Sequence, residues 1–268
     1  MPLEIRMLTS VSEIALGSRF FRGVWGGQED VVPVDIALAS GHVGGYFSGA
    51  FQGENLVAAS YGFAGRHDGL SVLHSHVTAS QVPGAGFELK KHQRSWAGDS
   101  GFDAITWTFD PLVRRNAVFN LEKLGATAVE YLVNFYGEMH DELNRGEQSD
   151  RLFAVWPTKP ATSTTASNAF ADGQQPSMPR LVAIRVDAYG SPQIDSAIDS
   201  LIEKRDAFCL ELPADIEQLR SANPDAASKW RLAVREVLKP AFERGAIINQ
   251  MTSNRAALLI EWNQEGAK

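Results

Sequence analysis

The segment Gln81-Val82-Pro83-Gly84-Ala85-Gly86 holds residues suited to binding an anion. It lies between a predicted strand and a predicted helix, and its glycines let backbone N–H groups approach a ligand without an intervening Cβ. The first turn of the helix adds free N–H groups and the positive end of its dipole, which favours a diphosphate. The same glycines also fit an ordinary turn. No Gly-Lys-Ser/Thr sequence follows, so the segment is not a P-loop, and it lacks the third glycine of a Rossmann fingerprint.

Two histidines, His74 and His76, precede this segment on a predicted strand. Because alternate residues of a strand face the same side, we expect both imidazoles on one face. An imidazole titrates near neutral pH, so one of them can act as a general base. Histidines packed or hydrogen-bonded within the fold are the other interpretation. A pair at this spacing can also bind metal, but no further Cys/His cluster accompanies it, so we predict no metal site.

The composition limits the classes of partner. The chain has 268 residues, of which 44% are hydrophobic and 21% charged, as in an ordinary globular protein. A formal net charge of −7 argues against broad nucleic-acid binding, which needs a basic surface. The single cysteine, Cys209, lies in an apolar run and predicts a buried thiol. We see no signal-peptide pattern and no apolar run of membrane-spanning length, so we expect a cytoplasmic protein with no membrane partner.

These residues must be positioned by a mixed set of strands and helices. Periodicity and turn residues predict, in order, a strand (3–8), two helices (11–25 and one opening near Pro33), three strands in a meander (45–51, 56–63, 71–78), a helix (84–101), a strand (104–109), a helix (111–125) and two strands (127–133, 152–156).

The stretch 158–179 is rich in Ala, Ser, Thr, Gly, Gln and Pro and predicts a flexible loop or linker. After it we expect a strand (181–186), a helix (193–204), a strand (208–212), helices at 214–221 and 225–244, and a terminal hairpin (246–251 with 256–262). Pro240 is expected to kink or break the second of these helices. The order strand, helix, strand repeats that of residues 71–109, so a degenerate second copy of a half-fold is one open interpretation.

The glycine segment also carries a family resemblance. Gln81-x-x-Gly84-x-Gly86 matches the Gln/Arg-x-x-Gly-x-Gly/Ala motif of the GNAT superfamily of N-acetyltransferases, and the predicted element order resembles theirs. The stretch Asn116–Gly125 is similar to the GNAT helix in which an Asn and an aromatic residue face coenzyme A. Further segments resemble an uncharacterised bacterial GNAT subgroup: Val24-Trp25-Gly26, Leu73-His74-Ser75-His76, Ile105–Leu112, Asn134-Phe135-Tyr136-Gly137 and Ser149–Leu152. The core resemblance covers about residues 1–157.

The resemblance implies an α+β fold: a splayed, mostly antiparallel central sheet flanked by helices. It implies an acyl-coenzyme A-binding core at 1–157, the linker at 158–179, and a C-terminal α/β extension at 180–268 packed on the core. Acetyl-coenzyme A, or another acyl-coenzyme A, would be the cosubstrate. The backbone of Val77, Thr78 and Ala79 would pair with its pantetheine arm, N–H groups of Gln81, Gly84, Ala85 and Gly86 would hold the pyrophosphate, and Asn116 or Asn120 would contact coenzyme A.

The resemblance also implies catalytic roles. His76 or His74 would be the base, and Tyr136, preferred over Tyr131, would protonate the departing thiolate. Trp25 and Asp110 would contact the acceptor, although a core position for Trp25 and a helix cap for Asp110 fit as well. The turn between residues 77–80 and Gln81 is shorter than in GNAT proteins.

The leading function is acyl transfer to an amine of a small molecule, with a homodimer expected by analogy. The alternatives are a GNAT-like binding or scaffold protein without transfer activity, and other acyl-coenzyme A chemistry such as decarboxylation.

Overall fold

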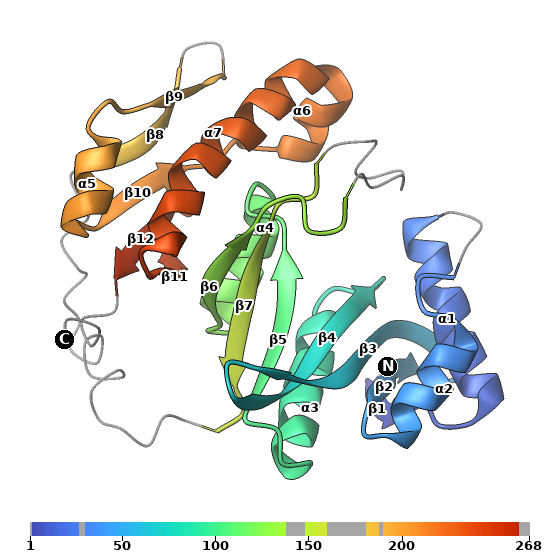
Figure 1. Ribbon diagram of the computed structural model, residues 1–268. Helices are drawn as coiled ribbons and strands as arrows, with labels where there is room; N and C mark the ends of the chain where they lie inside the picture. Colours follow the sequence, from blue (N-terminus) through green and yellow to red (C-terminus); the bar gives the residue numbers. More distant parts are fainter. Residues whose placement is uncertain (1, 27–29, 138–147, 160–180, 188–189, 263–268) are drawn as a thin grey trace. The chain divides into compact units, whose positions relative to one another are not determined.

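The computed structural model describes residues 2–26, 30–137, 148–159, 181–187 and 190–262 (Figure 1). These residues form two compact units, which we describe separately. Unit 1 comprises described residues 2–107 and 156–159; unit 2 comprises 108–137, 148–155, 181–187 and 190–262. The predicted linker 158–179 lies outside the described residues from 160 onward. None of the described helices combines the length and apolar composition that a bilayer-crossing helix needs.

Unit 1 contains the meander predicted from the sequence. Its elements are β1 (Glu4–Met7), α1 (Val11–Trp25), α2 (Val34–His42), β2 (Tyr46–Gln52), β3 (Asn55–His67), β4 (Leu70–Ser80), α3 (Ala85–Asp99) and most of β5 (Ala104–Phe109). Strands β1 to β4 pair antiparallel in sequence order. The predicted order of strands and helices is therefore confirmed over this part of the chain.

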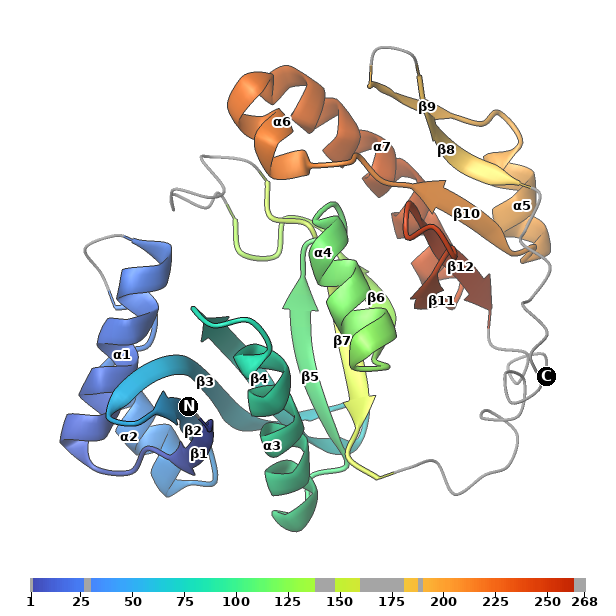
Figure 2. The same ribbon diagram turned by 180° about the vertical axis from the view of Figure 1, so that it is seen from behind.

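Helices cover both faces of this sheet. Phe47, Phe51 and Tyr61 pack with Ile14 and Phe21 of α1 on one face. Neighbouring strand residues Ala50 and Ala58 point the other way and pack against Ala85 and Leu89 of α3, as the alternation of a strand requires. Helix α3 lies behind the strands in Figure 1 and in front of them in Figure 2.

Ser10 is the N-cap of helix α1, a position that hydroxyl side chains favour. The Ser10 hydroxyl accepts from the Glu13 N–H while the Glu13 carboxylate accepts from the Ser10 N–H, which is a capping box. Gly17 allows α1 to approach the sheet, because a Cβ there would lie 2.6 Å from Cζ of Phe47.

Strands β4 and β5 pair over a short stretch and then part. The parallel ladder joins Val72–His74 to Ala104–Thr106, whereas β4 stays paired with β3 from Leu70 to Ser80. Within unit 1, residues 75–80 therefore have a strand partner on one side only, and we call them the free edge of β4.

Unit 2 contains the remaining elements: α4 (Arg114–Ala117), continued by the π-helix η1 (Val118–Lys123), β6 (Thr127–Leu132), β7 (Arg151–Pro157, shared with unit 1), β8 (Val182–Val186), β9 (Pro192–Ile194), α5 (Ile198–Lys204), β10 (Phe208–Glu211), α6 (Ile216–Ala222), α7 (Pro224–Glu243), β11 (Ala246–Met251) and β12 (Ala257–Trp262). Its strands lie in the order β7-β6-β11-β12-β10-β8-β9.

Three local predictions in unit 2 were wrong. The helix expected from Pro111 begins at Arg114, and the region expected to be helical from 193 starts with the short strand β9. Of the kink or break expected at Pro240, the break does not occur, because helix α7 continues to Glu243. Pro240 removes one hydrogen bond of the helix, but Val237, Leu238 and Ala241 around it are fully buried, so packing holds this last turn in place.

The C-terminal elements repeat the order of a half-fold. Strands β8 and β10 are parallel with α5 between them in sequence, and helices then lead to the antiparallel hairpin β11–β12. The earlier elements show the same order: parallel β4 and β5 with α3 between them, then α4 and the antiparallel pair β6–β7. This topology supports the interpretation that residues 182–262 are a degenerate second copy.

Candidate functional site

The free edge of β4 carries the residues predicted to hold a pantetheine arm. Val77, Thr78 and Ala79 pair with Tyr61, Ser60 and Ala59 of β3, so half of their backbone polar groups are used on that side. The remaining N–H and C=O groups of these residues point away from β3, because the backbone polar groups of a strand alternate between its two edges. An extended ligand can therefore add to the free edge as a further strand does.

A β-bulge changes the direction of β4 beside this edge. Tyr61 pairs with Val77 and Gly62 with Ser75, so His76 is the extra residue. A bulged residue is left unpaired in the ladder and its side chain is re-aimed. The rings of His74 and His76 both lie against Phe63, with centroids 5.1 and 6.0 Å away. The two imidazoles thus share one face despite the bulge.

Burial keeps both imidazoles neutral. It lowers the pKa of His74 to about 4, assisted by His76 and Lys90 nearby, and it also lowers the pKa of His76. Nδ1 of His74 lies 3.1 Å from Oγ1 of Thr106, whereas His76 is partly desolvated but more open to solvent than His74. A neutral imidazole can accept a proton, so His76 is the better placed of the two to serve as a base.

The glycine segment forms the N-terminus of α3. Gly84 has φ +85°, which favours glycine, and stands at the N-cap. Among the described residues, the N–H groups of Gly84 and Gly86 have no internal acceptor. The N–H of Gln81 donates to Val57 O at 2.9 Å, and that of Ala85 to Val82 O at 3.2 Å.

This pattern corrects part of the predicted diphosphate site. The Gln81 and Ala85 amides are occupied by the short turn itself. The turn is closed further by the Ser80 hydroxyl, which donates to Val82 O at 2.7 Å. Pro83 has no N–H. The loop therefore offers two free amides, Gly84 and Gly86, where the sequence predicted four.

In unit 2, the two candidate asparagines occupy different environments. Asn120 is buried within η1. Asn116 lines a cavity of about 630 Å³. The other residues lining this cavity are Arg114, Arg115, Val118, Phe119, Lys123, Ala214, Asn254 and Arg255. Of the two asparagines, Asn116 is therefore the one placed beside a cavity, whereas Asn120 is buried.

Tyr136 and Tyr131 differ in the freedom of their hydroxyls. Tyr131 is buried and donates to Asp150 at 2.6 Å; burial and the Asp150 charge both raise its pKa. Tyr136 is 42% exposed, and its hydroxyl lies 2.9 Å from Oγ1 of Thr108. Its N–H donates to the hydroxyl of Ser149 at 2.8 Å, which fixes the turn that carries it. Of the two tyrosines, Tyr136 is the one whose side chain is exposed.

Asp110 does not have a free carboxylate. Arg231 donates to both oxygens at 2.8 and 2.7 Å, and Arg220 donates at 2.7 Å. Burial opposes its ionisation, but the arginines outweigh burial and hold the pKa of Asp110 below its usual range. One oxygen also accepts the Leu112 N–H at 2.9 Å. The predicted contact with an acceptor amine is therefore wrong, because this carboxylate is buried and fully used.

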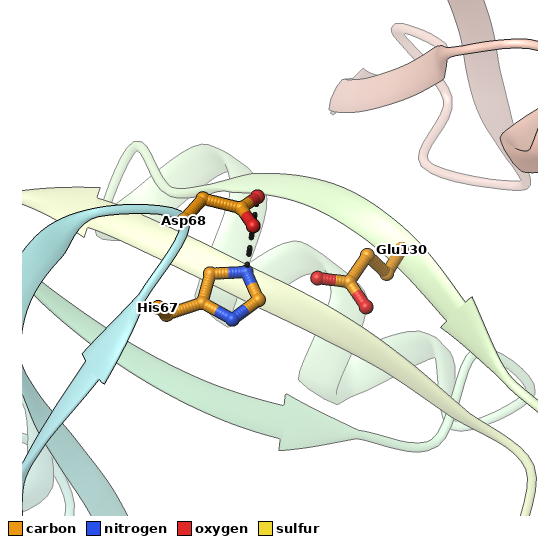
Figure 3. A group of neighbouring side chains, drawn as sticks. All are labelled: His67, Asp68 and Glu130. Atoms are coloured by element: carbon orange, nitrogen blue, oxygen red, sulfur yellow. Dashed lines mark ion pairs between the residues drawn. The ribbon is translucent and has the colours of Figure 1, made fainter.

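Trp25, the other predicted acceptor contact, is half-buried at the end of α1. Its ring lies 5.9 Å from that of Phe21 and packs on the core of unit 1. Beside the turn after β3, Nε2 of His67 lies 3.6 Å from the carboxylate of Asp68 (Figure 3). Within unit 1 this pair offers two ligand groups, fewer than a protein metal site uses. Glu130, also drawn, belongs to unit 2.

Sequence reasoning missed the burial of Lys90. Lys90 is 5% exposed although it stands beside Lys91 in a polar stretch. The signal was its spacing, since Gln93 and Ala97, three and seven residues later, are also on the buried side of α3.

No family model matches the sequence, and no curated protein matches it. The structure is similar to solved acetyltransferases. A GNAT-family acetyltransferase from Streptococcus pneumoniae is 15% identical over 58% of this chain and 99% of its own, with a TM-score of 0.47. A putative acetyltransferase from Salmonella typhimurium, solved with acetyl-CoA, is 14% identical over 62% and 99%, with a TM-score of 0.48. An N-acyl amino acid synthase from uncultured soil microbes is 14% identical over 59% and 91%, with a TM-score of 0.45.

Identities and TM-scores this low assign no activity, so the fold assignment rests on the elements themselves. The order from β1 to β7, the meander and the parting of β4 from β5 are those that the sequence resemblance implied. This chain therefore contains a mixed α/β fold of the GNAT type, followed by a further α/β segment.

Proposed function

We propose that this protein transfers an acyl group from acyl-coenzyme A to an amine of a small molecule. The observation that carries the proposal is the continuity of two binding elements in unit 1. The free edge of β4 ends at Ser80 and leads within four residues to the free amides at the start of α3. Coenzyme A has the matching sequence of groups, since an extended arm with two amides leads to a diphosphate.

The backbone would bind the cosubstrate. Val77, Thr78 and Ala79 pair with the pantetheine amides, and the N–H groups of Gly84 and Gly86 bind the diphosphate at the positive end of α3. These contacts use main-chain groups, so they hold the ligand without a particular side chain. The thioester end of the arm then lies toward the bulge at His76, where β4 and β5 part.

Transfer itself needs a base and an acid. We propose that neutral His76 accepts the proton of the attacking amine as its nitrogen forms a bond to the thioester carbon. The carbon–sulfur bond then breaks, and Tyr136 donates a proton to the departing thiolate. We assign this role to Tyr136 from the resemblance to the GNAT superfamily and from the exposure of its side chain. No covalent enzyme intermediate is required.

A second candidate is a protein that binds coenzyme A without transferring the acyl group. The occupied amides of Gln81 and Ala85 favour it, because a cradle with fewer donors holds the diphosphate less firmly. The homodimer, the cytoplasmic location, the domain division at 157 and 179, and contacts of Asn116 or Asn120 with coenzyme A stay predictions.

Calorimetric titration with acetyl-coenzyme A, followed by release of free thiol in the presence of an amine panel, tests the proposal. We expect saturable binding and thiol release that depends on an amine. Binding without thiol release for any amine would favour the second candidate. Absence of binding at millimolar ligand would exclude both.

A further inference from the structure

Lys90 places a buried amine among neutral partners. Its Nζ donates to Oγ of Ser75 at 2.7 Å and to Oε1 of Gln93 at 3.2 Å. It also lies 4.3 Å from the ring centroid of Trp107. Within the part of the chain that the structure describes, no carboxylate contacts this nitrogen. A buried ammonium without a counter-ion is costly, so its charge is conditional.

The position of this amine relative to the strands is specific. The β4–β5 ladder ends at the pair His74 and Thr106. The next residue on each strand is Ser75 on β4 and Trp107 on β5, and these are the two that Lys90 contacts. The amine therefore lies at the point where the strands part, on the side of α3.

A hydrogen-bond chain extends from this amine along the free edge. Nε2 of Gln93 donates to Oγ of Ser60 at 3.1 Å, and Oγ of Ser60 lies 2.7 Å from Oγ1 of Thr78. Lys90 thus contacts the free edge directly at Ser75 and indirectly at Thr78. These two residues bracket His76, the proposed base, and Val77, whose backbone is proposed to pair with the pantetheine arm.

Both protonation states are accessible near neutral pH. Burial lowers the pKa of Lys90 to about 7. The acidic residues of α3 are Glu88, which pairs with Lys91, and Asp99 at the far end of the helix. On the neighbouring strands the titratable groups are His74 and His76 of β4, His67 of β3, and Tyr46 of β2, which bonds to His92 of α3. Burial alone shifts the pKa of Lys90, so neither carboxylate holds the ammonium charged. An anionic ligand would supply the missing negative charge.

We propose that Lys90 is a positioning residue whose ammonium form is coupled to binding of the acyl-coenzyme A anion. This inference rests on the proposed function. Gly86 and Gly84 precede Lys90 by four and six residues on one helix, which is roughly 6–9 Å at the helical rise, so a diphosphate bound there is near enough to interact with the ammonium. Binding therefore takes up a proton from solvent, and by reciprocity the protonated amine strengthens binding. The ammonium then fixes Ser75 where the free edge begins.

Proton uptake can be measured directly. We would titrate acetyl-coenzyme A into wild type, Lys90→Met and Lys91→Met at pH 8 in two buffers of different ionisation enthalpy. Lys91 is a matched control, because it is the next residue, is exposed, and pairs with Glu88. Protonation of the ligand's own phosphates is common to all three proteins. On binding acetyl-coenzyme A, wild type and Lys91→Met should each take up more protons than Lys90→Met, by at most about one proton per site.

The pH dependence of affinity gives an independent readout. Wild-type affinity should fall by up to about tenfold per pH unit above 7, whereas Lys90→Met should lose this dependence and Lys90→Arg should bind with a flat profile. Equal proton uptake in wild type and Lys90→Met, or a flat wild-type profile, would overturn this inference alone. If wild type binds no acetyl-coenzyme A at any pH, the proposed function fails and the inference falls with it.

Discussion

At the scale of single residues, catalysis should depend on His76 more than on His74. His76 is exposed at the bulge, while His74 bonds to Thr106. We expect His76→Ala to lower kcat by about 10²–10⁴-fold with little change in KM for acyl-coenzyme A, as for loss of a general base. Steady-state kinetics with His42→Ala, an exposed histidine at the end of α2, provide the control. Full turnover by His76→Ala would show that the base lies elsewhere.

Tyr136 allows a second test at this scale. Tyr136→Phe removes the hydroxyl that lies 2.9 Å from Thr108 and keeps the ring in contact with Phe135. Without a proton for the thiolate, we expect kcat to fall by about 10²-fold or more, while calorimetric binding of acetyl-coenzyme A stays unchanged. Thr108→Val is the companion variant, since it removes the neighbour of the hydroxyl and not the proton donor. Equal losses in both variants would indicate a structural role for this pair.

Asp110 should govern stability and not turnover. Asp110→Asn removes the negative charge that buried Arg231 and Arg220 share. We expect this loss to lower the free energy of unfolding, measured by urea denaturation, by about 3 kcal/mol or more. Asp30→Asn, in an ion pair with Arg22 at partly exposed side chains, should change stability far less. A small effect of Asp110→Asn would mean that the arginine cluster tolerates an uncharged centre.

The pH dependence of this contribution has a defined sign. The pKa of Asp110 is lower in the folded protein than in the unfolded chain. Its stabilisation is therefore fully present above the unfolded-state value of about 3.9 and is lost as the pH falls below it. Acid titration of stability should show this loss in wild type and a weaker one in Asp110→Asn.

At the scale of elements, the loop between β4 and α3 should control cosubstrate binding. Gly84→Ala forces a Cβ onto a residue at φ +85°, at a conformational cost of roughly 1–2 kcal/mol. Relief of that strain moves the Gly84 and Gly86 amides, so we expect acetyl-coenzyme A affinity to fall by tenfold or more. Gly69→Ala, at φ +81° in the turn after β3, carries the same strain away from the loop. Similar losses of affinity in both variants would count against the loop.

At the scale of the whole chain, the second half-fold should be necessary for folding of the first. Within unit 2, Asp110 is paired with Arg220 and Arg231 of the C-terminal elements, and β6 pairs with β11. A chain ending at residue 157 keeps Asp110 buried without these arginines and exposes the edge of β6. We expect it to be aggregated or unfolded by circular dichroism and gel filtration, beside the full chain as reference. A monomeric, cooperatively unfolding fragment would contradict this dependence.

The sequence by itself determined most of the elements and their order. Periodic apolar residues, the Ser10 cap and the turn glycines act within a few residues, so α1 and β5 occur with the predicted bounds. The motif Gln81-x-x-Gly84-x-Gly86 was likewise readable, because the conformational freedom of Gly84 is a local property. The π-helical continuation of α4 and the strand β9 were not readable, since packing decided them.

Only the tertiary structure decided which polar groups are free. Asp110 was predicted near an acceptor, but arginines more than 100 residues away in sequence occupy it. Lys90 stands next to exposed Lys91 in a polar stretch, yet it lies buried where β4 and β5 part. The Gln81 amide is used by Val57 of another strand. Hydrogen bonding and burial depend on neighbours that folding brings together from distant parts of the chain. The spacing of residues along the sequence therefore does not show which individual polar groups stay free.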